Sequence, residues 1–281
     1  NSVSVKEVTR DNVPRIDYSG CPRILAEPQR TNVNTYSEDF SQSFYIKDSG
    51  VSVGTTNNVS PSGDSNATKI DVTDNGRIYA NVTSSTYVSS VFIKAGTFSY
   101  FKIGGVNIDL VLGTNANGTI ESLGSGWFRV GINYTGNRPF QIQAYPNGSY
   151  ATHTTTGDYY IWGSQIEAGT YQTSYIPTSG STVTRNQDQF SRDGIGSLIN
   201  STEGVLFAEM AALSDDGTSR AISIFQNGSN FIKLLYSATS NRVDFVAFSG
   251  GNLSCNITKV ISNTTENTKF GLKWKVNDFA L

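Results

Sequence analysis

The stretch that decides the fold is Tyr159–Arg185, with the sequence YYIWGSQIEAGTYQTSYIPTSGSTVTR. It begins with aromatic and β-branched residues, which favour a strand, and it turns at Ala168-Gly169-Thr170. It then passes through Ser174-Tyr175-Ile176-Pro177 into a run rich in Ser, Thr and Gly. We interpret the stretch as the closing strand of one β-rich unit, followed by the start of a second unit.

The composition predicts an all-β protein. The 281 residues are 37% hydrophobic and 16% charged, and they include 27 Gly, 15 Phe and 14 Tyr. Aromatic and β-branched residues fit a half-buried pleated surface, whereas Gly, Asn, Asp and Ser fill turns. Ala, Leu, Glu and Lys dominate no window, so we expect very little helix. Because domains average roughly 100–150 residues, the length allows two β-sandwiches.

Charge and hydropathy exclude several classes of partner. The 21 basic and 23 acidic residues give a formal charge of −2 without a basic stripe, so we expect no nucleic-acid partner. There is no run of about 18 apolar residues, so we expect no membrane span. The N-terminal residues lack the basic start and apolar core of a signal peptide. Cys21 and Cys255 fall in different predicted domains, which predicts two free thiols.

Predicted strands recur roughly every 8–12 residues in the first unit, which is typical of a sandwich or barrel. They are residues 68–72, 77–83, 87–94, 98–103, 106–112, 126–134, 140–145 and the strand from Tyr159. A strand pair within Phe44–Val53 is predicted around Asp48-Ser49-Gly50, and further hairpins at Asp74-Asn75-Gly76 and Gly104-Gly105. Residues 126–134 and 140–145 are predicted to form the next pair.

The predicted domain organisation has four parts. Residues 1–20 read as an extended docking segment, and residues 21–185 as the first sandwich. The stretch from residue 183 to 199 is charged and poorly periodic, and we place a linker at 186–199. Residues 200–281 predict a meander of roughly six strands, followed by a turn that begins one more. The second sandwich therefore looks incomplete.

Several segments carry a resemblance to a known family. They are Pro22–Asn32 (PRILAEPQRTN), Tyr36–Phe40 (YSEDF), Gly126–Val130 (GWFRV), Tyr160–Thr178 (YIWGSQIEAGTYQTSYIPT) and, more loosely, Ser89–Gly96 (SSVFIKAG). Together they resemble the jelly-roll, carbohydrate-binding-module-like domains of tailed-bacteriophage structural proteins, over about residues 14–185. The region 198–281, chiefly Gly271–Leu281 (GLKWKVNDFAL), is similar to the laminin-G/concanavalin-like sandwiches that follow such domains.

The resemblance implies a setting and a function. It implies a non-enzymatic virion protein of a fibre, tail or head decoration. Such a protein is often a homotrimer, bound to other virion proteins and contacting glycans of the host surface. The rival interpretation is a secreted bacterial carbohydrate-binding module attached to a polysaccharide-degrading enzyme. Phe44-Tyr45 stands where the family often has a tryptophan, and tyrosine can replace it if that aromatic is a core plug.

One set of residues fits a carbohydrate site, because aromatic faces stack on sugars while amides and guanidinium groups bind hydroxyls. Alternation places Phe128 and Val130 on one face of their strand, and Trp127 and Arg129 on the other. The candidate site residues are Trp127, Arg129, Gln141, Gln143 and Tyr145. A plainer interpretation stays open, and the pattern favours it: Trp127 packs under a loop and the glutamines are ordinary exposed residues. Trp162, in the closing strand, is predicted to be core.

No catalytic constellation is evident. His153, the one histidine, lies in a Thr-rich stretch, and no serine has a nucleophile-elbow motif. A glycosidase needs two carboxylates about 5–10 Å apart, and the sequence cannot pair the available ones, which are Glu27, Asp109, Glu121 and Glu167. No dense Asp/Asn loop predicts a cofactor; Asp39 and Glu167 are the candidates if a structural Ca²⁺ binds.

Overall fold

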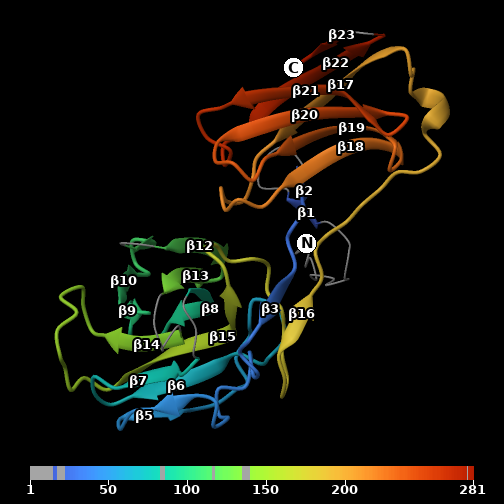
Figure 1. Cartoon of the computed structure of the whole chain (residues 1–281). Coiled ribbons are helices and arrows are strands. Elements are labelled where there is room, and N and C mark those ends of the chain that lie inside the picture. Colours follow the sequence, from blue (N-terminus) through green and yellow to red (C-terminus); the bar gives the residue numbers. More distant parts are fainter. Residues whose placement is uncertain (1–14, 18–22, 83–85, 116–117, 135–139, 277) are drawn as a thin grey trace. The chain divides into compact units, whose positions relative to one another are not determined.

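The computed structural model describes residues 15–17, 23–82, 86–115, 118–134, 140–276 and 278–281 (Figure 1). The chain divides into two compact units, 1–190 and 191–281. The described residues contain strands and one short 3₁₀ turn at Gly196–Leu198 but no α-helix, which confirms the all-β prediction. No described helix is long and apolar enough to cross a membrane. Of the predicted docking segment 1–20, only residues 15–17 lie in the described part, and Cys21 lies outside it.

Two six-stranded sheets form the body of the first unit. Sheet I has the order β11 (Thr114–Asn115), β10 (Val106–Asp109), β9 (Tyr100–Ile103), β14 (Phe140–Tyr145), β7 (Arg77–Ala80) and β4 (Ile46–Lys47). Sheet II has the order β12 (Thr119–Gly124), β13 (Trp127–Tyr134), β8 (Tyr87–Ala95), β15 (Gly157–Ala168), β6 (Thr68–Val72) and β5 (Val51–Val53). All neighbours in both sheets are antiparallel.

Alternating apolar side chains from both sheets fill one core between them. Phe101 of β9 and Tyr159 of β15 meet across it with ring centroids 5.1 Å apart, and both are almost completely buried. Ile142 of sheet I and Ile132 of sheet II belong to the same cluster. Tyr45, for which the sequence left a core or a sugar-stacking position open, is 2% exposed and packs on Phe40. It is therefore a core plug, which answers the question that the sequence left open.

Two predicted turns do not close hairpins. The turn Asp48-Ser49-Gly50 joins β4 to β5, and Asp74-Asn75-Gly76 joins β6 to β7, so each carries the chain from one sheet to the other. The two corners support each other: the N–H of Thr73 donates to the Gly50 carbonyl at 2.8 Å. A Cβ at Gly50, where φ is +80°, would lie 2.4 Å from the Asp74 carboxyl carbon. The packing of the corners, and not local pairing, explains these glycines.

The remaining pairing predictions have mixed outcomes. The Gly104-Gly105 hairpin is confirmed, since Ile103 pairs with Val106 and both glycines have positive φ, as a type I′ turn requires. The predicted pairing of 126–134 with 140–145 is wrong, because β13 lies in sheet II and β14 in sheet I. Both strands bury an apolar face, so a two-layer core can place them in opposite layers.

Short strands close the first unit at its two ends. β3 (Arg30–Asn32) pairs with β16 (Val183–Arg185), just before the predicted linker 186–199, in a stretch that the sequence showed as charged and poorly periodic. The hydroxyls of Thr31 and Thr184 share a hydrogen bond of 2.7 Å across this pair. A separate hairpin joins β1 (Arg15–Asp17) to β2 (Arg23–Leu25). The first sandwich therefore begins and ends on paired strands.

Buried amides fix the segment after β3 against the closing strand β15. The Asn32 amide donates to the Ile176 carbonyl at 2.8 Å, and its oxygen accepts from the N–H of Ile166 at 3.0 Å. The Asn34 amide donates to the Tyr45 hydroxyl at 2.7 Å and also contacts the Ser164 hydroxyl. These side chains replace backbone partners where β15 is interrupted by a bulge between Trp162 and Gln165.

The second unit has two smaller sheets. Sheet III has the order β17 (Glu203–Met210), β22 (Thr268–Lys275) and β23 (Asp278–Ala280), and sheet IV has the order β18 (Arg220–Asn227), β19 (Asn230–Tyr236), β20 (Arg242–Ser249) and β21 (Asn252–Val260). Phe270 of sheet III and Leu234 of sheet IV share one core cluster. The predicted meander holds for sheet IV, whereas β17 pairs with β22. Cys255 of β21 is a free thiol.

We expect the native protein to retain un-ionised tyrosines at alkaline pH. Burial raises the pKa of Tyr45, Tyr159 and Tyr175 well above the ordinary value of 10.0. Since the unfolded chain ionises these phenols near pH 10, their stabilisation is complete below that pH and is lost above it. At pH 11 the loss is about 1.4 kcal/mol for each buried tyrosine.

Absorbance at 295 nm during a titration, compared with guanidinium unfolding at pH 8 and pH 11, checks this expectation. Near pH 11 the native protein should show at least three ionised tyrosines fewer than the 14 of the denatured chain. Ionisation of all tyrosines near pH 10 in the folded state would contradict the buried positions.

Candidate functional site

The five predicted carbohydrate-binding residues do not share one face. Trp127 and Arg129 lie on β13 in sheet II, whereas Gln141, Gln143 and Tyr145 lie on β14 in sheet I. The single site predicted from the sequence is therefore wrong in its geometry. The reason is the same as for the mispredicted strand pair, since the chain crosses between the sheets after β13.

Trp127 and Arg129 are structural. Trp127 is 3% exposed, and its indole N–H donates to the Val59 carbonyl at 3.2 Å, under the loop before β6. Arg129 is 9% exposed and donates from Nη2 to the Thr173 carbonyl at 2.6 Å, with its guanidinium over the Phe92 ring. The plainer interpretation of Trp127 is thus confirmed, and Arg129 holds the segment after β15 on sheet II.

Gln141, Gln143 and Tyr145 belong to a polar and aromatic surface on the outer side of sheet I. Their neighbours Phe140, Ile142 and Ala144 are at most 1% exposed in the core, so these three side chains point away from it. The register places further residues beside them on β7 and β9. We call this surface the tyrosine face; it consists of Arg77, Tyr79, Tyr100, Lys102, Gln141, Gln143, Tyr145 and Tyr150.

Tyr145 is the centre of the tyrosine face. Its ring meets that of Tyr150 at 5.4 Å and 67°, while Tyr150 meets Tyr100 at 6.2 Å and 85°. The ammonium group of Lys102 lies 5.2 Å from the Tyr145 ring centroid. Tyr145 itself is 3% exposed, whereas Tyr100, Tyr150 and Lys102 are partly exposed. Burial raises the pKa of Tyr145 above its ordinary value.

Polar groups flank these rings. Gln143 donates from its amide to the Asn75 carbonyl at 2.6 Å, and that bond fixes its orientation. Arg77 donates to Asp48 at 2.6 Å, and this hydrogen bond raises the pKa of the guanidinium. Aromatic rings with fixed amides and cations beside them suit ligands that carry both C–H faces and hydroxyls. The arrangement fits a sugar.

The sequence interpretation missed five residues of the tyrosine face, which are Arg77, Tyr79, Tyr100, Lys102 and Tyr150. The alternation of Tyr100-Phe101-Lys102-Ile103 already placed Tyr100 and Lys102 on one side of their strand. What the sequence lacked was the neighbour relation between β9, β14 and β7, which comes from connections that cross the core.

The calcium candidates are engaged in local structure. Glu167 is buried, and its carboxylate accepts from the Thr173 N–H at 2.7 Å and the Thr173 hydroxyl at 2.6 Å. Asp39 accepts from the Ser41 and Gln42 side chains, and these hydrogen bonds lower its pKa. Within the described ranges, no group of three or more His, Cys, Asp or Glu side chains is arranged to hold a metal ion.

Glu27, Asp109 and His153 are also engaged in local structure, whereas Glu121 is exposed. Glu27 forms a buried ion pair with Arg185, and Asp109 accepts from the N–H groups of Val111 and Leu112 in a turn. The His153 ring contacts the Ala144 carbonyl through Nε2 at 2.8 Å. Glu121 lies exposed on β12, at the edge of sheet II.

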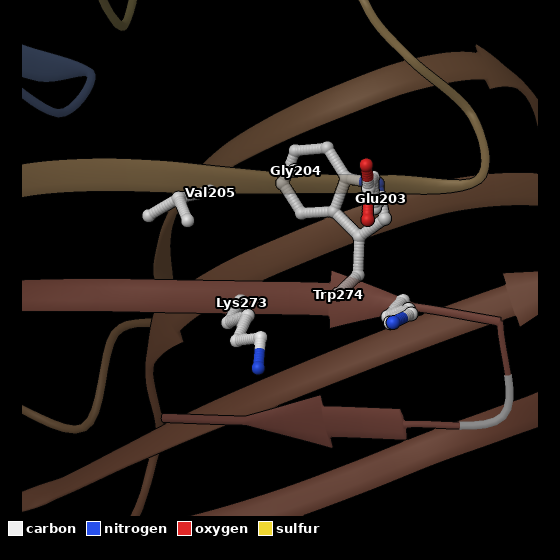
Figure 2. A pocket seen from close by; sticks show the side chains of 6 residues that line it. Glu203, Gly204, Val205, Lys273 and Trp274 are labelled. Atoms are coloured by element: carbon white, nitrogen blue, oxygen red, sulfur yellow. The ribbon is translucent and has the colours of Figure 1, made fainter.

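A hollow of about 220 Å³ lies in sheet III, between β17 and β22 (Figure 2). Its main feature is Trp274, whose indole lies across Gly204, where a Cβ would come within 2.2 Å of the ring. The indole N–H donates to the Asn200 carbonyl at 3.1 Å. Glu203 and Lys273 line the rim. The indole is thus committed to packing on β17, and we assign this hollow no chemistry.

Comparison with known proteins identifies no family and no function for this chain. No family model matches the chain, and no curated protein matches it.

Proposed function

We propose that the chain is a non-enzymatic structural protein of a bacteriophage virion and that its tyrosine face binds glycans of the host surface. The observation that carries the binding proposal is the cluster of Tyr100, Tyr145 and Tyr150, with Lys102 beside it. The virion setting is supported by the resemblance of segments such as Tyr160–Thr178. It brings with it an expected homotrimer that contacts other virion proteins.

A non-enzymatic role is supported by how the candidate catalytic groups are used. Glu27 and Glu167 are buried and bonded to their own chain, so a substrate could not reach them without unfolding part of the first unit. Asp109 closes a turn. Three of the four acidic residues considered for glycoside hydrolysis therefore have structural roles, whereas Glu121 is exposed on β12.

We expect the double variant Tyr100→Ala/Tyr150→Ala to lose about tenfold or more in glycan affinity, since removing a stacking ring costs on the order of 1.4 kcal/mol. Both rings are partly exposed, so the fold should survive. Binding is measured on an array of bacterial surface glycans and then by calorimetry. Trp127→Phe, on sheet II, is the matched control and should bind as the unmodified protein does. Equal affinity of the double variant and the control would contradict the proposal.

The proposed place of the protein in the virion is tested separately from glycan binding by the tyrosine face. An antibody raised against residues 23–185 should label intact phage particles in negative-stain images, and light scattering should give the mass of a trimer. Labelling of secreted bacterial enzyme instead of particles would favour the carbohydrate-binding module of a polysaccharide-degrading enzyme. That result would leave the tyrosine face as a sugar site and remove only the virion role.

A further inference from the structure

Strand β18 is an outermost strand of sheet IV and presents an open edge (Figure 1). In the described part of the chain it pairs only with β19, so one row of its backbone N–H and C=O groups has no strand beside it. Six of its eight residues are exposed. Ile222 is 38% exposed and Phe225 is 65% exposed. An exposed apolar edge of this kind is a template for pairing with another strand.

β18 lacks the charges that usually protect a long edge strand from such pairing. The other edge strands longer than three residues in the described ranges each carry charged side chains, which are Glu121 of β12, Glu203 and Glu209 of β17, and Lys259 of β21. β18 has one charge, on Arg220 at its first residue, and that guanidinium lies 2.9 Å from the Asp216 carboxylate. The rest of the strand is uncharged and contains no proline. Its one irregularity, a register shift between Phe225 and Asn227, lies at its end.

The side chains of β18 that point toward sheet III lie outside the core. The register places Ile222 beside Leu234 and Ile224 beside Ile232, and Leu234 is completely buried. Ile222 and Ile224 nevertheless belong to neither core cluster of the second unit, whereas Ile257 of the opposite edge strand β21 packs on one of them. Covering the two isoleucines of β18 therefore requires apolar groups from outside the unit.

The sequence of β18 is complementary to itself in an antiparallel pair. With Ser223 on a two-fold axis, Ile222 lies opposite the partner's Ile224, so four isoleucines meet on the inner side of the sheet. On the outer side Ala221 lies opposite the partner's Phe225, and the small side chain leaves room for the ring. No two charged side chains face each other in this register.

The neighbouring registers fit less well. Moving the axis to Ile222 sets Arg220 opposite the partner's Ile224. Moving it to Ile224 sets Ile222 opposite the partner's Gln226. Each alternative places a polar side chain against an isoleucine on the inner side, so the register centred on Ser223 is preferred.

We propose that β18 pairs antiparallel with β18 of a second copy of the chain, so that the four strands of sheet IV from each copy form one continuous sheet. Backbone hydrogen bonds join the two edges, and the isoleucines fix the register. Because one strand from each copy forms a small contact, the pairing should be populated as the protein concentration rises. It joins chains in pairs, so it adds to the expected homotrimer without forming it, and it stands without the virion role.

Sedimentation of the full chain, from micromolar to near-millimolar concentration, tests the pairing. The mass of the particle should rise at least twofold. Ile222→Lys should abolish the rise, because it places an ammonium group against the partner's Ile224 while leaving both core clusters intact. Leu253→Lys, on the opposite edge strand and with Leu253 55% exposed, is the matched control and should associate as the unmodified chain does. A constant mass of the unmodified chain, or the same rise in Ile222→Lys, would overturn the proposal.

Cysteine cross-linking tests the register in a Cys21→Ser/Cys255→Ser background. Ser223→Cys should form an intermolecular disulfide, because residues that face each other in an antiparallel pair have Cα atoms about 4.5–5.5 Å apart. Ala221→Cys is the control, since the two copies of that residue would lie about 14 Å apart along the strands. Mild oxidation should cross-link Ser223→Cys at least tenfold faster than Ala221→Cys. Equal rates would show random collision and would contradict a paired edge.

Discussion

Replacing Arg185 by alanine is expected to lower the free energy of unfolding of the first domain by about 3–5 kcal/mol. Arg185 and Glu27 form an ion pair of 3.0 Å with side chains only 7% and 4% exposed. Arg185 also donates to the Ser174 carbonyl at 3.1 Å, while Glu27 accepts from the Ser174 N–H at 2.8 Å. Truncating the arginine leaves a carboxylate buried without that guanidinium, and it removes a link between β16 and the segment after β15.

A double-mutant cycle separates the charge from the packing. Arg185→Met alone and Glu27→Leu alone should each cost a similar amount, because each leaves one charge of the pair buried without its partner. Arg185→Met combined with Glu27→Leu should cost far less than the sum, since apolar residues of similar volume often replace a buried ion pair without loss. Guanidinium unfolding followed by tryptophan fluorescence gives the four free energies. Additive costs would show that the two side chains do not act as a pair.

The second large effect is expected at Trp162, where alanine should cost about 3–5 kcal/mol. Trp162 is 6% exposed, and its ring lies 5.0 Å from that of Phe92 and 4.8 Å from that of Tyr175. These three side chains, with Trp127, form a second apolar cluster outside the main core. Removing the indole would leave a cavity between sheet II and the segment that contains Tyr175.

Trp162→Phe is the matched control. The indole N–H of Trp162 is buried and has no acceptor among the residues that the structure describes, so phenylalanine removes a polar group that gains nothing. We expect it to cost less than about 1.5 kcal/mol, because an aromatic ring still fills most of the space and the lost N–H had no partner. Equal losses for the alanine and phenylalanine variants, measured by the same unfolding curves, would show that the ring does not support this cluster.

The sequence predicted the strands better than their partners. Alternation located β6 and β14 with their observed bounds, because a strand with one buried face leaves a period of two in the chain. It also identified Trp162 as core, which its burial confirms. The residues of a turn did not show whether it closes a hairpin or carries the chain from one sheet to the other, because Asp74-Asn75-Gly76 is compatible with both. The packing of Gly50 on Asp74 in the structure distinguishes the two cases.

The candidate site shows the same limit. Gln141, Gln143 and Tyr145 were found because they alternate with Phe140, Ile142 and Ala144. Trp127 and Arg129 were wrongly joined to them, because a period of two gives the face of a strand but not the sheet to which it belongs. The alternation of side chains also cannot show that Trp127 and Arg129 are buried, or that the segment around Thr173 lies on sheet II.

The pairing of β3 with β16 has a consequence for how such a domain can be used. Because the first and last strands of the sandwich are neighbours, the chain enters and leaves it at one place. Domains with adjacent ends tolerate insertion into other proteins and circular permutation. Joining residue 188 to residue 27 by a short linker keeps the Arg185–Glu27 ion pair, because residues 188 and 27 are adjacent. With new ends cut at the Gly104-Gly105 turn, the rearranged chain should reach the same fold. For the same reason, the sandwich could be inserted as a domain into a surface loop of an unrelated protein.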